Sequence, residues 1–338
     1  MDGTCHSILR TLGFRLIFAV IYVLLSTSLL TGFLIKNPKS LHRMLKITGN
    51  YFLGIFLYTL VIILLADFGR ILLKYVFHAS WIHSRTAFTV TGAICALLIL
   101  LLSACGIFHA KYIKTTSYDV IINKTIPERT SMKVVLLADT HFGYNAGVLH
   151  ARELVRKINK QKPDLVCIAG DIFDNEYDAI RNPEKLEKTL RGIKSTYGVY
   201  ACWGNHDLNE EILAGFTFKH KDGDLSNIKD PRMKKFLEDS NIHILEDESV
   251  LINDQFYVIG RKDASLTEKI HETRKAPAQL TEKLDRDKPI IMIDHQPKEL
   301  QELADAGVDL DLCGHTHNGQ TFPGNFTIKL MWENPCVF

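Results

Sequence analysis

The segment MKVVLLADTH, residues 132–141, carries the clearest fold signal in this chain of 338 residues. From Met132 to Ala138 it is apolar apart from Lys133, as expected of a strand that is covered on both faces. Asp139 and His141 follow at the point where the strand should end. Ligands of open α/β sheets bind beyond the carboxyl ends of the strands, so the segment predicts a strand leading into a functional site.

Short apolar runs alternate with amphipathic ones through the rest of the chain. This alternation predicts a layered α/β domain with a partly parallel sheet. The expected strands are 132–138, 164–169, 198–203, 241–247, 250–253, 255–259, 289–293 and 310–313, and the expected helices are 148–160, 184–194 and 298–306.

Polar side chains that bind metals follow five of these strands. Carboxylates, amide oxygens and imidazoles suit Mn²⁺, Fe²⁺ or Zn²⁺, and a carboxylate such as Asp171 can bridge two ions. One such motif could arise by chance, whereas five in order at strand ends predict a site for two divalent ions. The motifs are Asp139-x-His141, Gly170-Asp171-x-x-Asp174, Gly204-Asn205-His206-Asp207, Asp294-His295 and Gly314-His315-x-His317.

Three apolar stretches precede this domain, at residues 16–35, 51–73 and 86–108. Each has about 20 residues, the length that a helix needs to cross a bilayer. The first lacks a convincing cleavage site and two more spans follow it, which argues against a signal peptide. We therefore expect a multi-pass membrane anchor over residues 1–115 and a catalytic domain over residues 116–338.

The charge distribution bears on orientation and partners. Around the spans, seven basic residues lie on the side of the catalytic domain and five on the other, which favours a cytoplasmic domain. A missed or extra span would reverse that orientation. The net charge is +2 and no basic stripe is interleaved with aromatics, so nucleic acid is not an expected partner. The seven cysteines have no CxxC spacing, which predicts reduced, packed thiols.

The motifs D-x-H, G-D-x-x-D, G-N-H-D, a lone histidine and G-H-x-H resemble those of the calcineurin-like metallophosphoesterases, from Met132 to about Gln320. The resemblance implies a four-layer α/β/β/α sandwich. The membrane anchor, LADTH at 137–141 and GHTHNGQ at 314–320 are similar to a bacterial branch. That branch is often compared with UDP-2,3-diacylglucosamine diphosphatases, which act on lipid precursors.

The resemblance also implies roles for individual residues. His206 would lie beside the scissile bond, Asp174 would orient it and Asp207 would support the ligands. A hydroxide that bridges the two metals would attack phosphorus directly. One metal would be held by Asp139, His141 and His317, the other by Asn205, His295 and His315, with Asp171 as the bridge.

The sequence therefore predicts a membrane-anchored, metal-dependent hydrolase of a phosphoester or pyrophosphate bond, with a lipid-linked substrate as one option. The chain ends 21 residues after His317, where family members usually continue. We expect a shortened domain with an exposed sheet edge. The alternatives are an inactive membrane scaffold that keeps the fold, a nuclease or protein phosphatase on the same centre, and a transporter. Substrate, metal identity and oligomeric state stay open.

Overall fold

The computed structural model describes residues 12–127, 129–210, 212–213, 216–217, 229–319 and 324–332. The chain divides into two compact units. One comprises residues 1–113 with 212–217, and the other comprises residues 114–211 with 218–338.

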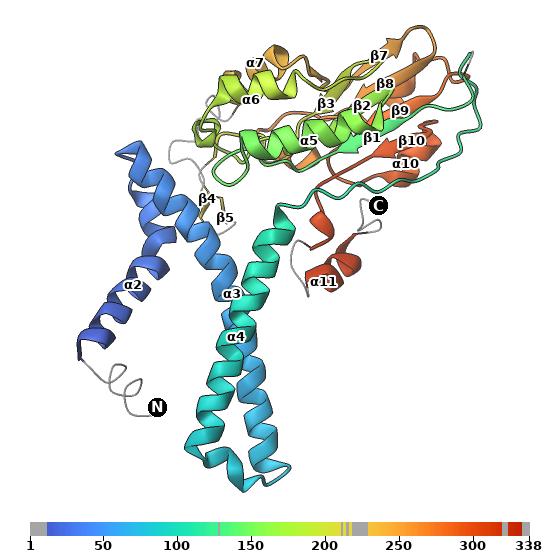
Figure 1. The fold of residues 1–338 in the computed structure, drawn as a ribbon. Helices are drawn as coiled ribbons and strands as arrows, with labels where there is room; N and C mark the ends of the chain where they lie inside the picture. The colour runs from blue at the N-terminus through green and yellow to red at the C-terminus, as the bar shows by residue number, and fades with distance from the viewer. Residues whose placement is uncertain are drawn as a thin grey trace. The chain divides into compact units, whose positions relative to one another are not determined.

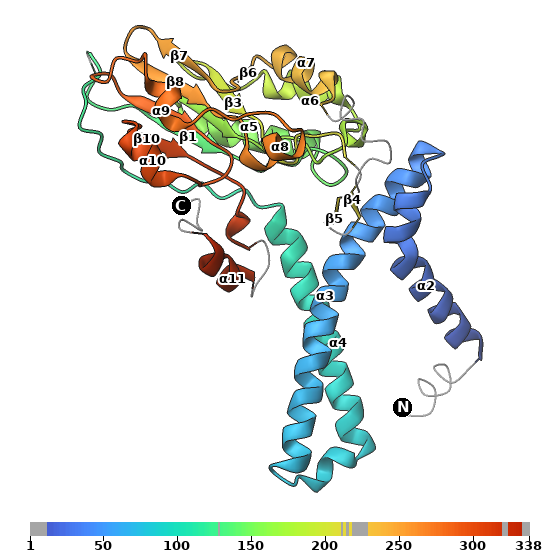
Figure 2. The same ribbon diagram turned by 180° about the vertical axis from the view of Figure 1, so that it is seen from behind.

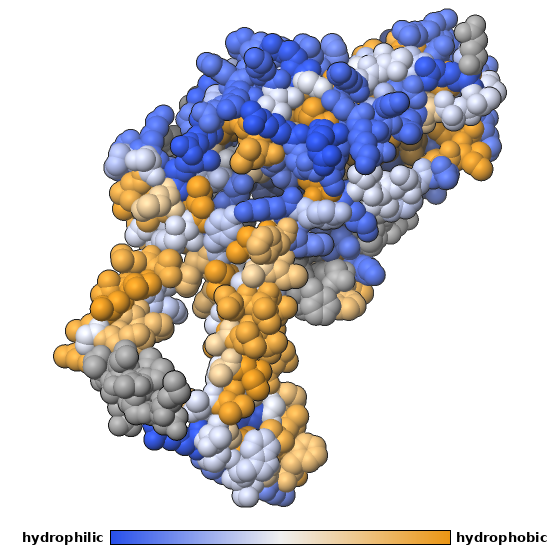
Figure 3. Space-filling model, in the orientation of Figure 1, coloured by the Kyte–Doolittle hydropathy of each residue, from blue (hydrophilic) through white to orange (hydrophobic). Residues whose placement is uncertain are grey.

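The first unit consists mainly of long apolar helices. Each of three helices is long and apolar enough to cross a membrane, and apolar side chains cover most of their visible surfaces (Figure 3). The three expected apolar helices are thus confirmed, and the second begins at Lys39 rather than at residue 51. The elements are α2 (Leu12–Leu34), α3 (Lys39–Tyr75), the 3₁₀ turn η1 (Ser80–His83) and α4 (Arg85–Ala110), with the short antiparallel pair β4 (Ile212–Leu213) and β5 (Phe216–Thr217).

The second unit contains two four-stranded sheets. The first has the order β1-β2-β3-β6 and all its strands are parallel. Helices α5 and α6 lie over one face of it (Figure 1). The elements are β1 (Val134–Leu137), α5 (Val148–Gln161), β2 (Leu165–Ala169), η2 (Tyr177–Ala179), α6 (Pro183–Leu190), β3 (Val199–Cys202), α7 (Pro231–Asp239) and β6 (His243–Ile244).

The second sheet has the order β10-β9-β8-β7. Its first three strands are parallel and β7 joins β8 as an antiparallel hairpin. Viewed from behind, α9 and α10 lie over this sheet (Figure 2). The elements are β7 (Glu248–Ile252), β8 (Phe256–Gly260), α8 (Ala264–Lys269), α9 (Pro277–Thr281), β9 (Ile290–Ile293), α10 (Leu300–Asp305), β10 (Leu310–Leu312), η3 (His317–Gly319) and α11 (Gly324–Met331).

The two sheets pack face to face. Side chains of a strand alternate between its faces, and Leu165 and Cys167 of β2 join Ile291 and Ile293 of β9 in one buried cluster. The alternate residues of β9 pack on the other side, where Met292 meets Leu303 of α10. Strands buried on both faces require a covering helix layer on each side. The expected α/β/β/α sandwich, preceded by three apolar helices, is confirmed.

The main differences from the expected elements are additional short helices. Helices α7, α8, α9 and α11 were not expected, because each has nine residues or fewer and offers little periodicity to detect. The expected strand 241–247 is ordered as a ladder only at His243 and Ile244.

Candidate metal centre

The predicted site residues follow the carboxyl ends of β1, β2, β3, β9 and β10. Five of them have a positive φ, between 41° and 75°, a region that residues other than glycine rarely occupy. Such strain persists only where the surrounding structure enforces it, and it concentrates at functional sites. The five are Asp139, His141, Asp171, His315 and His317.

Backbone hydrogen bonds between neighbouring turns hold these residues in place. The backbone N–H of Asp139 donates to the carbonyl of Gly170 over 3.1 Å, and that of His141 donates to the carbonyl of Asp171 over 3.0 Å. The N–H of His315 donates to Oδ2 of Asp139 over 3.0 Å. The loops after three strands are thus tied together before any metal is considered.

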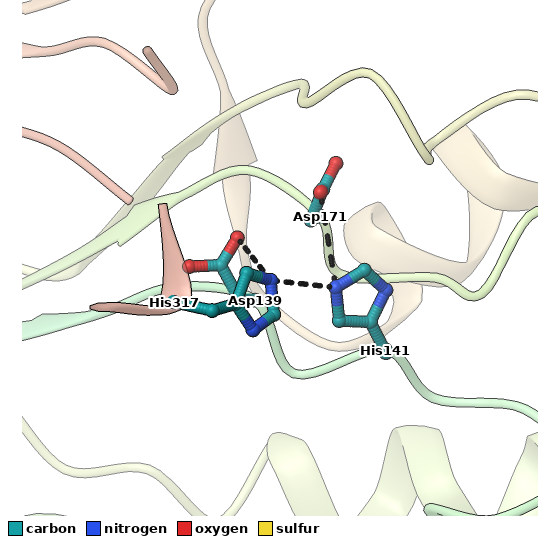
Figure 4. A group of neighbouring side chains, drawn as sticks. All are labelled: Asp139, His141, Asp171 and His317. Carbon is teal, nitrogen blue, oxygen red and sulfur yellow. Dashed lines mark hydrogen bonds and ion pairs between the residues drawn. The ribbon is translucent and has the colours of Figure 1, made fainter. Parts of the chain in front are cut away.

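One group of ligand atoms comes from Asp139, His141, Asp171 and His317, all within 4.8 Å of one another (Figure 4). Nε2 of His317 lies 3.3 Å from Nε2 of His141 and 3.5 Å from Oδ1 of Asp139. Oδ2 of Asp171 lies 3.8 Å from Nε2 of His141. Two ligands that bind one ion at about 2.1 Å lie about 3.0–3.4 Å apart. The spacing of His317 and His141 fits a shared cation, and the other two spacings are slightly longer.

A second group comes from Asp171, His295 and His315. Nε2 of His295 lies 3.2 Å from Oδ2 of Asp171 and 3.1 Å from Nδ1 of His315. Oδ1 of Asn205 lies 3.0 Å from the same Nε2. Nδ1 of His295 is 2.8 Å from the carbonyl oxygen of Ala169 and can donate to it, which leaves Nε2 as the atom that could bind a metal.

Asp171 belongs to both groups, and its side chain is almost completely buried. Burial alone would raise the pKa of its carboxyl, but the charge of His295 and a hydrogen bond from it hold the pKa below its usual range. In return, Asp171 overrides the effect of burial on His295 and raises the pKa of that imidazole to about 10. A buried carboxylate that faces two ligand sets is what a bridging ligand requires.

The imidazoles of His141 and His315 have the opposite shift. Burial, together with the positive charge of other histidines, lowers the pKa of each to about 4. Both rings are therefore neutral at pH 7 and present an unprotonated nitrogen. Imidazole, carboxylate and amide oxygen are a donor set for Mn²⁺, Fe²⁺ or Zn²⁺, so the residues present fit two divalent ions.

Two glycines permit this close arrangement. Gly170 has a φ of +72°, and a Cβ there would lie 2.8 Å from Nδ1 of His295. A Cβ on Gly204 would overlap the carboxylate of Asp171. Glycine at both positions lets the loops after β2 and β3 approach each other around the shared carboxylate.

His206 lies beside the first group, and its ring centroid is 5.0 Å from that of His141. Its backbone N–H donates to Oδ1 of Asp171 over 2.7 Å. Its Nδ1 lies 2.5 Å from Oδ1 of Asn175, a buried residue that sequence reasoning missed. Asp174, the expected partner, shares a cluster with His206 and His141 in which the ligand atoms lie within 4.8 Å of one another.

Asp207 connects the loops after β2 and β3 through hydrogen bonds. Its carboxylate accepts from the backbone N–H groups of Phe173 and Gly204, each over 2.8 Å. Burial and the neighbouring Asp171 raise the pKa of Asp207 to about 8. The side chain thus joins the turn after β2 to the turn after β3, and its carboxylate points at backbone amides.

A buried ionic cluster behind His295 was also missed. Arg261 is fully buried, and its Nη1 donates to Oδ2 of Asp294 over 3.0 Å. Nη2 of Arg274 donates to the same oxygen over 2.5 Å. The position of Asp294 directly before His295 was a sequence signal for an important carboxylate. Its partners Arg274 and Arg261 lie 20 and 33 residues away, so the ion pairs themselves had no local signal.

The cysteines near the site pack as expected. Burial raises the pKa of the thiols of Cys202 and Cys313, which keeps them protonated and unreactive at neutral pH. Cys313 donates to Oδ2 of Asp311 over 3.0 Å. Neither arrangement resembles an activated nucleophile.

Comparison with known proteins gives a consistent family assignment. The sequence pattern of the calcineurin-like phosphoesterases matches residues 132–319. An uncharacterized metallophosphoesterase of Campylobacter jejuni is 31% identical over 210 residues, which cover 60% of this chain and 48% of that protein. A transmembrane protein with a metallophosphoesterase domain from Bos taurus is 27% identical over 252 residues, covering 71% of this chain and 52% of that protein.

A functionally named relative is the UDP-2,3-diacylglucosamine pyrophosphatase LpxG of Chlamydia trachomatis. It is 22% identical over 255 residues, covering 63% of this chain and 75% of that protein. The chain spans about half the length of the bovine and Campylobacter relatives that it matches.

Proposed function

The chain belongs to the calcineurin-like phosphoesterase family, and from its ligand geometry we propose that it is a membrane-anchored phosphoesterase with two divalent metal ions. It hydrolyses a phosphoester or pyrophosphate bond. The observation that carries this proposal is the position of Asp171. Its buried carboxylate lies within ligand distance of both groups of metal-binding side chains.

The ligand sets follow from the two groups. Asp139, His141 and His317 hold one ion, and Asn205, His295 and His315 hold the other, with Asp171 shared. When bound, a pair of Mn²⁺, Fe²⁺ or Zn²⁺ ions lowers the pKa of a water molecule and neutralises charge on the phosphoryl oxygens. The hydrogen bonds between the strand-end loops hold the ligand side chains in fixed positions, so the site needs no reorganisation during the reaction.

His206 acts on the leaving group in this proposal. Nδ1–H is held by the acceptor Oδ1 of Asn175, and the backbone N–H is held by Asp171. Nε2 is then the atom that donates a proton to the departing oxygen or a hydrogen bond to the phosphoryl group. A positioned general acid of this kind contributes about 100- to 10,000-fold to a rate.

The substrate class follows from the anchor. Three apolar helices in the same chain indicate attachment to a membrane. One relative is named for a pyrophosphatase of a diacylated sugar nucleotide. We therefore favour a lipid-linked phosphate ester or pyrophosphate as the substrate.

Residues 1–115 act as the anchor and residues 116–338 as the catalytic part. The excess of basic residues on the domain side of the spans favours a cytoplasmic catalytic domain. Protease treatment of sealed inverted and right-side-out vesicles tests this orientation. Cleavage of the domain only in right-side-out vesicles would place it on the opposite side.

Hydrolysis of bis(p-nitrophenyl) phosphate by the full-length chain tests the activity. We expect turnover with added Mn²⁺, Fe²⁺ or Zn²⁺ and its loss with a chelator. Asp171→Ala should abolish both turnover and the binding of two metals. Asp178→Ala removes a carboxylate that is exposed outside the site and serves as the matched control.

Two outcomes would overturn the proposal. Metal-independent hydrolysis that survives in Asp171→Ala would place the chemistry elsewhere. Two tightly bound metals without turnover on any ester, including lipid extracts, would instead support an inactive scaffold that keeps the fold.

A further inference from the structure

Helix α11, residues Gly324–Met331, has two faces with different surroundings. Ile328 and Trp332 are partly buried and lie four residues apart, so they project from the same side. Phe326 and Leu330 are 58% and 88% exposed and project from the opposite side, because a helix turns about 100° per residue. Met331 is 73% exposed and lies about 100° around the helix from Leu330, at the border between the two faces.

The inner side of the helix contacts the metal centre. The ring centroid of Trp332 lies 5.1 Å from that of His315, with the rings edge to face. Nζ of Lys298 lies 5.8 Å from the centroid of the Trp332 ring. The segment therefore forms part of the wall beside a proposed metal ligand.

The outer side of the helix is an exposed apolar surface with a positive edge. Lys329 is the one charged residue between Gly324 and Trp332, and it lies at the border of the outer face, whereas Lys298 lies beside Trp332 on the inner side. Large apolar side chains exposed together mark an interaction surface. Apolar residues combined with lysines and an aromatic residue are typical of helices that lie in a membrane interface.

The apolar helices of the same chain keep the domain near such an interface. Helix α4 is long and apolar enough to cross a membrane and ends at Ala110, and the first strand of the catalytic domain begins at Val134. The connecting segment, residues 111–133, can extend over about 80 Å at most. The catalytic domain is thus held permanently within reach of a bilayer, at a high effective concentration.

We propose that the outer face of α11, formed by Phe326 and Leu330 with Met331 at its border, docks onto the surface of the anchoring bilayer and brings the metal centre to phosphoesters of membrane lipids. A helix with its side chains is about 10–12 Å wide, so a docked surface lies about one helix diameter from His315. Lys329 favours a bilayer that contains anionic phospholipid. The choice of lipid as substrate rests on the proposed phosphoesterase activity, whereas the docking does not.

Photocrosslinking in vesicles tests the docking directly. The full-length chain is reconstituted into vesicles of phosphatidylcholine and phosphatidylglycerol, with photoreactive benzoylphenylalanine in place of Leu330 or, separately, Met331. The same group in place of Leu149 on α5 is the matched control, because Leu149 is also apolar and 80% exposed. Lipid adducts are then identified by mass spectrometry.

We expect about tenfold more lipid adducts from positions 330 and 331 than from position 149, and fewer adducts in vesicles of phosphatidylcholine alone. Equal yields at all three positions would overturn the proposal. Crosslinks from position 330 to a second copy of the chain would also overturn it and assign the surface to self-association.

The readout separates this inference from the proposed activity. Adduct formation needs no turnover, so the experiment can be repeated in the Asp171→Ala background with the same expectation. Adducts without hydrolysis would retain the docking and reject the activity. Hydrolysis without adducts would support the activity and reject the docking.

Discussion

Nδ1 of His206 lies 2.5 Å from Oδ1 of Asn175, and the backbone N–H of Asn175 donates to the carbonyl oxygen of His206 over 3.1 Å. Asn175 is 2% exposed, so it has little freedom to move. Two reciprocal contacts fix both the backbone and the ring of the histidine. The asparagine is therefore a positioning residue for the proposed general acid.

Replacing Asn175 by alanine should lower kcat by about 100-fold, because a misplacement of about 1 Å can cost that much. KM and metal content should change little, since Asn175 lies outside both ligand sets. Asn175→Asp keeps an acceptor at the same place and should restore most of the rate. Steady-state kinetics with metal analysis measures the effect, and an unchanged kcat in Asn175→Ala would contradict the assigned role.

This pair shows where prediction from sequence ends. Parallel strands place their carboxyl ends at one edge, so the convergence of Asp139, Asp171 and His315 could be expected from the motifs. That Asn175, in addition to Asp174, lies against His206 depends on the path of a turn. Asn175 adopts a φ of +60°, and a sequence pattern does not specify that rotation.

The buried arginine was beyond prediction for a similar reason. Arg261 follows β8 in a stretch that looks like an ordinary loop, and arginines are rarely buried completely. Its burial results from packing against Asp294, which lies 33 residues away. Pattern and composition report on neighbours in sequence, whereas such a cluster depends on tertiary contacts.

Gly204→Ala should disrupt the metal centre by steric overlap alone. The added methyl group would overlap the carboxylate of Asp171 and force the shared ligand to move. We expect a loss of at least one bound metal and a fall in kcat of about 100-fold. Metal content and turnover measure the effect.

Gly147→Ala is the matched control for this substitution, because a Cβ at Gly147 would meet nothing within 4 Å. It should bind two metals and turn over at the wild-type rate. If Gly204→Ala behaved in the same way, the close approach of the loops would not be needed for metal binding.

Metal binding at pH 7 should release at least one proton per protein, because His295 loses one and a water molecule bound to the metals can lose another. In the metal-free chain Asp171 raises the pKa of His295 to about 10, so its Nε2 carries a proton that a metal must displace. His141 and His315 have pKa values of about 4 and are already neutral, so they release none. Apparent affinity should therefore rise by about tenfold per pH unit above pH 7, up to the pKa of His295. Calorimetry in two buffers of different ionisation enthalpy measures the proton count, and a value near zero would contradict it.

Arg261→Ala should destabilise the catalytic domain strongly. Burial already raises the pKa of Asp294 although two arginines lie beside it. Removing Arg261 would leave a fully buried carboxylate with one partner, which costs about 3–5 kcal/mol. For a domain of this size, that loss lowers the Tm by roughly 6–20 °C.

Arg232→Ala is the control, because Arg232 is half exposed in its ion pairs with Asp230 and Asp178, and its removal should cost less than about 1 kcal/mol. Thermal unfolding of the detergent-solubilised chain compares the two variants. The two variants differ in that only Arg261→Ala removes the partner of a fully buried carboxylate. An equal fall in Tm for both would therefore mean that Asp294 is stabilised by something other than Arg261.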